Sequence, residues 1–228
     1  MSEALLVHAD RDGLAAALAA QLGDAIEAAV GRSGAATLVV AGGSTPAPAY
    51  RALDASSLAF ARVTMLPSDE RWVPVDHELS NDAMLRSCFP SALAAGLTVV
   101  PLSSAPTPIE DALRDVDTAV GALPSPFDVV LLGMGDDGHT ASLFPDDPAI
   151  AENEASEALA AIARPPSQPT ARVTLTPRAL LKARELVLAI SGAEKRRVIE
   201  EALQQPDLHP IGRLLARSEV PTTIHWCP

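Results

Sequence analysis

The sequence predicts an α/β protein: a single Rossmann-like domain over residues 1–228, with a mostly parallel sheet flanked by helices on both faces. Short runs rich in Val, Leu and Ile recur along the chain without alternating with polar residues, as in strands buried on both faces. Helical patterns separate these runs, and several runs end directly in Gly or Ser. The length of 228 residues suits one such domain.

Each apolar run marks an expected strand, and each amphipathic segment or cap marks an expected helix. We expect strands at 5–7, 37–41, 63–66, 97–100, 127–132, 172–176, 185–190 and 222–226. We expect helices after Asp10 or Asp12, after Thr45 and Pro46, after Ser80, at 109–120, after Thr176 and Pro177, around Lys195 and at 211–215.

Composition limits the partners. The net charge of −12 opposes binding to nucleic acid or to anionic membranes, and 3% aromatic residues leave few side chains for stacking on bases. Cys88 and Cys227 form no metal motif or disulfide framework. The expected protein is cytoplasmic, a monomer or weak homodimer, and holds any anionic substrate through a local cationic cluster.

The stretch FDVVLLGMGDDGHTASLFP joins a buried strand to a turn rich in glycine, at the sheet edge where α/β proteins bind ligands. His139 has the side chain suited to proton transfer near neutral pH, and Asp137 lies two residues before it. The turn also matches the dinucleotide pattern G-x-G-x-x-G. Asp136, Asp137 and the helix-breaking Pro145 argue against a pyrophosphate there, so we favour a catalytic role over a nucleotide site or a structural histidine.

A second glycine-rich exit follows the strand at 37–41. Gly42, Gly43 and Ser44 precede Thr45, a good helix cap, and Pro46, a good first helical residue. A plain strand-to-helix turn explains Thr45 and Pro46 but not the two glycines and Ser44. The sequence therefore predicts a phosphate cradle at a helix N-terminus.

Two further charged positions follow strands. Asp69, Glu70 and Arg71 form either a solvated turn or, beside the rigid sequence WVP, a functional loop in which Arg71 binds an oxyanion, carboxylate or phosphate. Lys195 falls in the first turn of a helix, which the helix dipole disfavours unless an anion is near. The proline-rich acidic segment 146–169 is expected to be mobile or lid-like.

Six motifs in order resemble the 6-phosphogluconolactonase family. They are AGGSTP (41–46), SDERWVP (68–74), SN (80–81), LGMGDDGHTASLFP (132–145), RVTLTP (172–177) and SGAEK (191–195). The resemblance implies a fold shared with the glucosamine-6-phosphate isomerase/deaminase group, no metal or nucleotide cofactor, and a phosphorylated sugar lactone as substrate. The implied reaction is hydrolysis of 6-phospho-D-glucono-1,5-lactone in the pentose phosphate pathway.

One position departs from the family pattern: Asp146 follows LFP where the family commonly has Gly, which puts the following loop's geometry in question. The deaminase group usually has Asn-Glu-Pro after the DGH triplet, whereas this chain reads TASLFP, which favours the lactonase. An amino-sugar deaminase and a non-catalytic sugar-phosphate sensor remain alternatives.

The resemblance and the residue types together assign roles to the site. His139 is the expected general base, Asp137 orients it, Arg71 stabilises the oxyanion or grips sugar hydroxyls, and Asp69 orients Arg71. The phosphate is expected to bind among Gly42, Gly43, Ser44, Thr45, Arg172 and Lys195.

Overall fold

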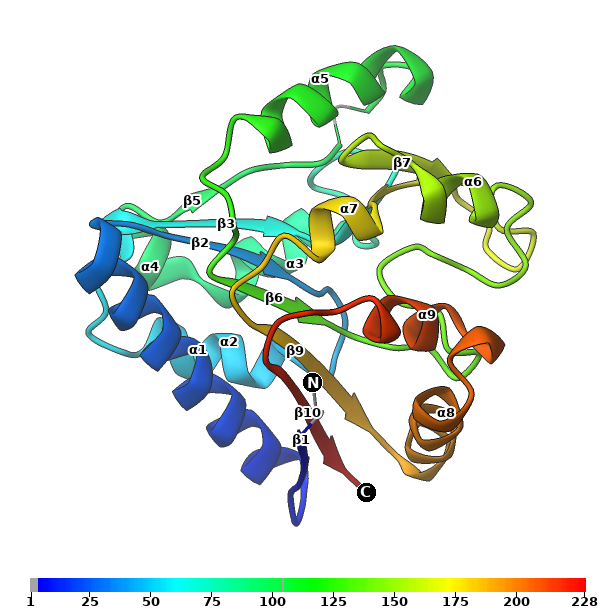
Figure 1. Ribbon diagram of the computed structural model, residues 1–228. Helices are drawn as coiled ribbons and strands as arrows, with labels where there is room; N and C mark the ends of the chain where they lie inside the picture. Colours follow the sequence, from blue (N-terminus) through cyan, green and yellow to red (C-terminus); the bar gives the residue numbers. More distant parts are fainter. Residues whose placement is uncertain (1–3, 104) are drawn as a thin grey trace.

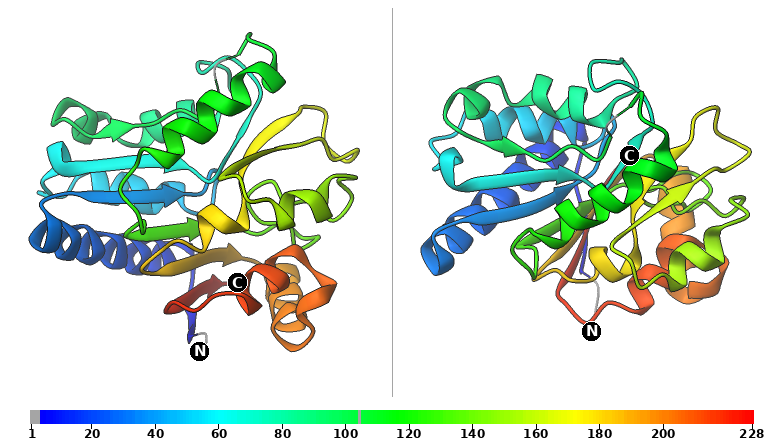
Figure 2. Two further views of the ribbon diagram at one scale, coloured as in Figure 1. Left: turned by 45° about the horizontal axis from the view of Figure 1, so that its top comes forward. Right: turned by 90° about the horizontal axis from the view of Figure 1, so that it is seen from above.

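A computed structural model describes residues 4–103 and 105–228, and its centre is a parallel sheet of seven strands. In spatial order the strands are β1 (Ala4–Val7), β10 (Thr222–Cys227), β9 (Leu186–Ser191), β6 (Val129–Leu132), β2 (Ala36–Val40), β3 (Val63–Pro67) and β5 (Thr98–Val99). Helices surround this sheet (Figures 1 and 2), so the predicted α/β class is confirmed.

The helices bury two separate apolar layers against the sheet. One layer packs under α1 (Arg11–Ser33), α2 (Ala47–Asp54), α3 (Asn81–Cys88) and α4 (Pro90–Ala94). The other packs under α5 (Ile109–Gly121), α7 (Pro177–Leu180), α8 (Ala193–Gln204) and α9 (Pro210–Ala216). In β6, Val129 and Leu131 enter the first layer while Val130 and Leu132 enter the second, which explains why the strand is apolar throughout.

Helix α1 begins where the sequence predicts, with Asp10 as its cap: the Asp10 carboxylate accepts a hydrogen bond from the Gly13 amide at 2.8 Å. Within residues 4–103 and 105–228, α1 is the one helix long and apolar enough to cross a bilayer by length and composition alone. Its apolar face, with Leu14, Leu18 and Leu22, is buried against the main sheet, so its composition reflects core packing.

A second, three-stranded antiparallel sheet contains β4 (Asp69–Arg71), β8 (Arg172–Leu175) and β7 (Ala160–Ala163). The strand expected at 172–176 is therefore present but lies outside the main sheet. Polar and apolar residues alternate along this strand, yet Arg172, Val173, Thr174 and Leu175 are all buried. The small sheet brings Arg172 directly opposite Arg71 in the strand register.

The segment 146–169, which the sequence predicts to be mobile or lid-like, carries regular structure. It contains α6 (Ile150–Ala155) and β7, which pairs with β8. The Asp146 carboxylate accepts from the Ser167 amide at 2.9 Å, and the Asp147 carboxylate accepts from the Arg164 amide at 3.0 Å. These bonds tie both ends of the segment together, and Asp146 has a defined role in the loop.

The predicted cap at Thr45 is wrong. Helix α2 begins at Ala47 after a turn over Ser44, Thr45 and Pro46, and no side chain caps it. The Tyr50 hydroxyl instead donates to the carbonyl oxygen of Ala41 at 2.7 Å and holds the helix against the end of β2. The start of α2 is thus anchored by the tertiary packing of Tyr50 and has no side-chain cap.

The strand order sets the position of the site. From β2 the chain runs to β3 and β5 on one side, and then returns to β6, β9 and β10 on the other. The switch point lies between the neighbouring strands β2 and β6, whose carboxyl ends carry the two glycine-rich exits. In open α/β sheets this is where ligands bind.

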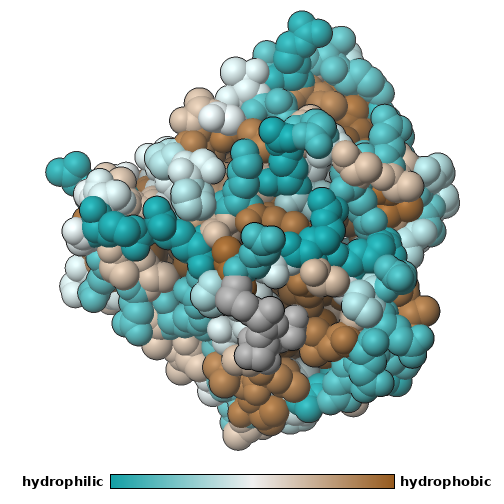
Figure 3. All heavy atoms as spheres, in the orientation of Figure 1, coloured by the Kyte–Doolittle hydropathy of each residue, from teal (hydrophilic) through white to brown (hydrophobic). Residues whose placement is uncertain are grey.

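Hydrophilic and hydrophobic residues are interspersed on the face shown in Figure 3. Among the described residues, exposed large apolar side chains include Leu6 and Val7 on the edge strand β1, and Val75 and Leu79 in the loop after β4. A few exposed apolar residues of this kind are normal for a globular protein.

Candidate active site

A cavity of about 270 Å³ opens at the switch point. It is lined by nine of the residues that the sequence nominates: Gly42, Gly43, Ser44, Thr45, Asp69, Arg71, His139, Arg172 and Lys195. The tenth, Asp137, contacts His139 from behind. Elements far apart in the chain therefore bring all the nominated residues to one place.

His139 belongs to the turn of residues 133–140, called the catalytic turn after the role that the sequence predicts for His139. Its Nδ1 lies 2.6 Å from an Asp137 carboxylate oxygen, and its side chain is 26% exposed. Partial burial raises the pKa of Asp137, but the hydrogen bonds and charge of His139 lower it overall. The Asp137 carboxylate accepts a hydrogen bond from Nδ1–H, so in the neutral imidazole Nε2 carries the lone pair that a general base needs.

Glycine is required in the catalytic turn for steric reasons. Gly138 has φ = +78°, in the left-handed region. A Cβ atom on Gly135 would overlap the His139 ring and would lie 2.6 Å from the Asp137 carboxylate. The glycines thus let the backbone fold tightly around the His139 and Asp137 pair.

Phe144 lies beside the catalytic turn and contacts two charged or titratable side chains. Its ring stacks on the His139 imidazole with centroids 4.0 Å apart, and the guanidinium carbon of Arg172 lies 5.0 Å from the Phe144 centroid. The aromatic ring is buried, so it fixes the position of the imidazole by packing. The face of an aromatic ring also attracts cations such as Arg172.

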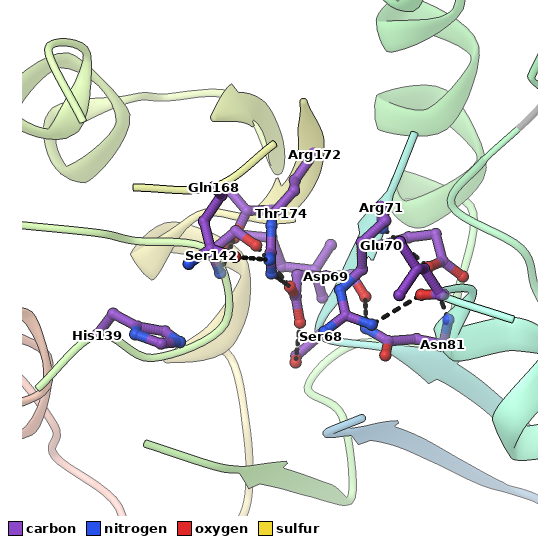
Figure 4. A network of polar contacts seen from close by, with 12 residues as sticks. Ser68, Asp69, Glu70, Arg71, Asn81, His139, Ser142, Gln168, Arg172 and Thr174 are labelled. Carbon is purple, nitrogen blue, oxygen red and sulfur yellow. Dashed lines mark hydrogen bonds and ion pairs between the residues drawn. The ribbon is translucent and has the colours of Figure 1, made fainter. Parts of the chain in front are cut away.

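Asp69 is buried at the centre of a polar group (Figure 4). Its carboxylate accepts from the Ser142 hydroxyl at 2.5 Å and the Ser68 hydroxyl at 3.2 Å, and lies 3.6 Å from Nη1 of Arg172. The expectation that Asp69 orients Arg71 is wrong. Strand β8 packs beside β4, so that Arg172 reaches the Asp69 carboxylate, while Nη1 of Arg71 donates to the Leu79 carbonyl oxygen at 2.7 Å.

Glu70 points away from the cavity and supports the loop after β4. Its buried carboxylate accepts from the amides of Arg71, Asn81 and Asp82 at 2.7 to 2.8 Å and from the Ser80 hydroxyl at 3.0 Å. Burial raises the pKa of Glu70, against the lowering effect of these donors. The carboxylate therefore joins β4 to the N-terminus of α3 and holds Arg71 and Asn81 at the cavity wall.

Two arginine side chains carry free donors at the site. Nε of Arg71 and Nε of Arg172 are buried and have no hydrogen-bond partner among residues 4–103 and 105–228. Burial lowers the pKa of Arg172, and the Arg71 charge lowers it further, while Asp69 opposes this. Arg71 and Arg172 both line the cavity, where guanidinium groups can bind an anionic ligand.

The second glycine-rich exit forms another wall of the cavity. Asn81 packs so closely on Gly42 that a Cβ atom at residue 42 would overlap its side-chain amide, whose nitrogen donates to the Asp69 carbonyl oxygen at 2.7 Å. Gly43 has φ = +95°. The Thr45 hydroxyl lies 3.5 Å from that of Ser191, and Lys195 follows on α8. The turn after β2 and the carboxyl end of β9 therefore lie side by side at the cavity.

Sequence reasoning assigned no role in the site to Asn81, Ser142, Phe144 or the supporting Glu70. Each lies inside one of the motifs quoted above, which was the available signal. Their roles depend on contacts between separate motifs, and spacing along the chain does not show such contacts.

Comparison with known proteins decides the family. The model of the glucosamine-6-phosphate isomerase/6-phosphogluconolactonase family matches residues 9–226. The chain belongs to this family. A 6-phosphogluconolactonase of Pseudomonas putida is 38% identical over 99% of this chain and 94% of its own length. One of Mesorhizobium japonicum is 36% identical over 96% of this chain and 93% of its own length.

A solved structure of a 6-phosphogluconolactonase has the same fold as this chain. The crystal structure of a 6-phosphogluconolactonase from Shewanella baltica superposes with a TM-score of 0.94, at 30% identity, over 100% of this chain and 98% of that chain. The resemblance expected from the six motifs is thus confirmed over nearly the whole of this chain.

Proposed function

We propose that this protein hydrolyses 6-phospho-D-glucono-1,5-lactone to 6-phospho-D-gluconate, a step of the pentose phosphate pathway. The observation that carries the proposal is the shared cavity: His139, poised as a base by Asp137, lines the same 270 Å³ as Arg71, Arg172 and Lys195. The reaction needs a base for water and cations for a phosphorylated sugar. The base and the cations line one cavity, so a single small substrate can contact both.

In the first step, Nε2 of His139 removes a proton from a water molecule as the water oxygen attacks the lactone carbonyl carbon. Asp137 keeps the other ring nitrogen protonated and stabilises the imidazolium that forms. Phe144 restricts the ring to one orientation. The immediate product is a tetrahedral oxyanion.

In the second step, the oxyanion collapses and the bond between the carbonyl carbon and the ring oxygen breaks. The imidazolium of His139 returns its proton to the ring oxygen, which becomes the 5-hydroxyl group, and the new carboxylic acid ionises in water. The guanidinium group of Arg71, which lines the cavity, supplies a donor for the oxyanion. No covalent intermediate with the protein is required.

The phosphate group binds at the other end of the cavity. Backbone amides of the turn 43–45, the hydroxyls of Ser44 and Thr45, and the ammonium group of Lys195 are its ligands in this proposal. Arg172, held by Asp69, adds positive charge between the two ends. This local charge offsets the overall net charge of −12.

The whole chain acts as one domain in the cytoplasm, as a monomer or weak homodimer, on a small phosphorylated lactone. The sedimentation velocity of the purified protein tests the oligomeric state directly.

Consumption of freshly prepared phosphogluconolactone, corrected for spontaneous hydrolysis, tests the proposed function. Wild type is expected to accelerate the reaction, and His139→Asn to lower kcat by about 10²-fold while it keeps the fold. His77→Asn, which alters an exposed histidine outside the cavity, is the matched control and should behave as wild type. Ammonia release from glucosamine 6-phosphate without lactone hydrolysis would instead identify a deaminase, and binding without turnover a sensor.

A further inference from the structure

The outer side of the catalytic turn packs against a histidine that lies outside the cavity. His209 directly precedes α9, and a Cβ atom on Gly138 would lie 2.6 to 2.7 Å from His209 side-chain atoms, Nδ1 among them. The imidazole of His209 thus occupies the space that any side chain at residue 138 would fill. Gly138 is needed here both for its positive φ and for this close approach.

Two consecutive carbonyl groups of the turn face the start of α9. Nδ1 of His209 lies 3.3 Å from the carbonyl oxygen of Asp137, and the amide of Ile211 donates to the carbonyl oxygen of Gly138 at 3.1 Å. On the other side of the His209 ring, Nε2 lies 3.6 Å from a carboxylate oxygen of Glu201 on α8. The ring is thus held between α8 and the peptide that carries Asp137.

The orientation of that peptide matters because the Asp137 side chain is 43% exposed and has little packing of its own. Its carboxylate must nevertheless stay 2.6 Å from Nδ1 of His139. A hydrogen bond to the Asp137 carbonyl oxygen limits rotation of the peptide, and so limits drift of the carboxylate away from His139. Misplacement by about 1 Å near reacting groups can reduce rates by about 10²-fold.

We propose that His209 is a positioning residue for the reaction: by donating from Nδ1 to the Asp137 carbonyl oxygen, it keeps the Asp137 and His139 pair aligned. This inference rests on the proposed lactonase function. His209 does not line the cavity and acts only through the catalytic turn. Its loss should therefore reduce kcat and leave KM nearly unchanged, because the residues proposed to bind phosphate are not in contact with it.

The test compares His209→Leu with His209→Asn. The two replacements have similar shapes, but only the Asn side chain places an N–H donor where Nδ1 of histidine stood. His209→Leu is expected to lower kcat about 10-fold with KM within about twofold of wild type, and His209→Asn to recover most of the loss. His209→Ala is a second donor-free variant in case leucine disturbs folding, which circular dichroism would reveal.

A second readout does not depend on turnover. The ring ¹⁵N signals of His139 report its hydrogen bond to Asp137, so they should change in His209→Leu and return toward wild type in His209→Asn. Wild-type kcat in the donor-free variants, an Asn variant as slow as the Leu variant, or unchanged His139 signals in His209→Leu would each overturn the inference. Absence of lactone turnover by wild type would instead contradict the proposed function, while the NMR comparison still tests the role of His209.

Discussion

The imidazole of His139 stacks on the ring of Phe144, with centroids 4.0 Å apart and the two planes inclined by 24°. The same aromatic ring lies 5.0 Å from the guanidinium carbon of Arg172. A buried, uncharged residue therefore contacts both the proposed base and one of the proposed anion-binding groups. Phe144 therefore fixes the position of the His139 ring relative to the Arg172 guanidinium group.

Replacement of Phe144 by leucine should remove the stacking surface and allow the His139 ring to rotate. We expect kcat for the lactone to fall about 10-fold, with a smaller rise in KM through Arg172. Steady-state kinetics provide the measurement. Phe127→Leu is the matched control, since Phe127 is equally buried but lies outside the cavity. Equal kinetic effects of the two changes would show that Phe144 acts only through stability.

Lys195→Ala should weaken binding of the phosphate. We expect KM to rise about 10-fold or more and kcat to change little, because a phosphate contact is the same in the ground state and the transition state. Competition by 6-phosphogluconate should weaken in parallel. Lys182, the other lysine of the chain, is exposed and outside the cavity, so Lys182→Ala is the control. A drop in kcat at constant KM would contradict this assignment.

Glu70→Gln should destabilise the protein. The buried carboxylate accepts four hydrogen bonds, whereas a glutamine amide turns its NH₂ group toward some of the same donors. We expect the free energy of unfolding in urea to fall by about 2 kcal/mol or more. Glu78→Gln, at an exposed carboxylate, should change it by less than about 0.5 kcal/mol. A loss no larger than that of the control would rule out the supporting role of Glu70.

The protein should lose stability as the pH falls from 6.5 to 4. His225, for which the sequence suggests no role, is buried. Its Nδ1 lies 3.0 Å from Nε2 of His8, and its Nε2 lies 2.5 Å from the side-chain oxygen of Gln21. The Gln21 amide nitrogen in turn donates to the Glu185 carboxylate. Burial, and then the His8 charge, lower the pKa of His225 to about 4. The unfolded chain, with a histidine pKa of about 6.5, therefore binds more protons in this window.

This protonation difference contributes up to roughly 3 kcal/mol, which is present above pH 6.5 and lost by pH 4. Denaturation at a series of pH values is the measurement. His225→Gln should flatten the pH dependence in this window, and His77→Gln, at an exposed histidine, should not. An unchanged slope in His225→Gln would assign the acid sensitivity to other groups.

The amino-acid sequence by itself determined the buried strands, the glycine-rich exits after β2 and β6, and the presence of His139 and Lys195 just after strands. These features are local, because apolar runs, glycines and helix starts act over a few residues. The pairing of Asp69 with Arg172, the support of α3 by Glu70, and the packing of Phe144 and His209 around the catalytic turn were decided only by the tertiary structure. The small antiparallel sheet and the start of α9 bring together residues far apart in the chain, and contacts between distant segments leave no periodic pattern in the sequence.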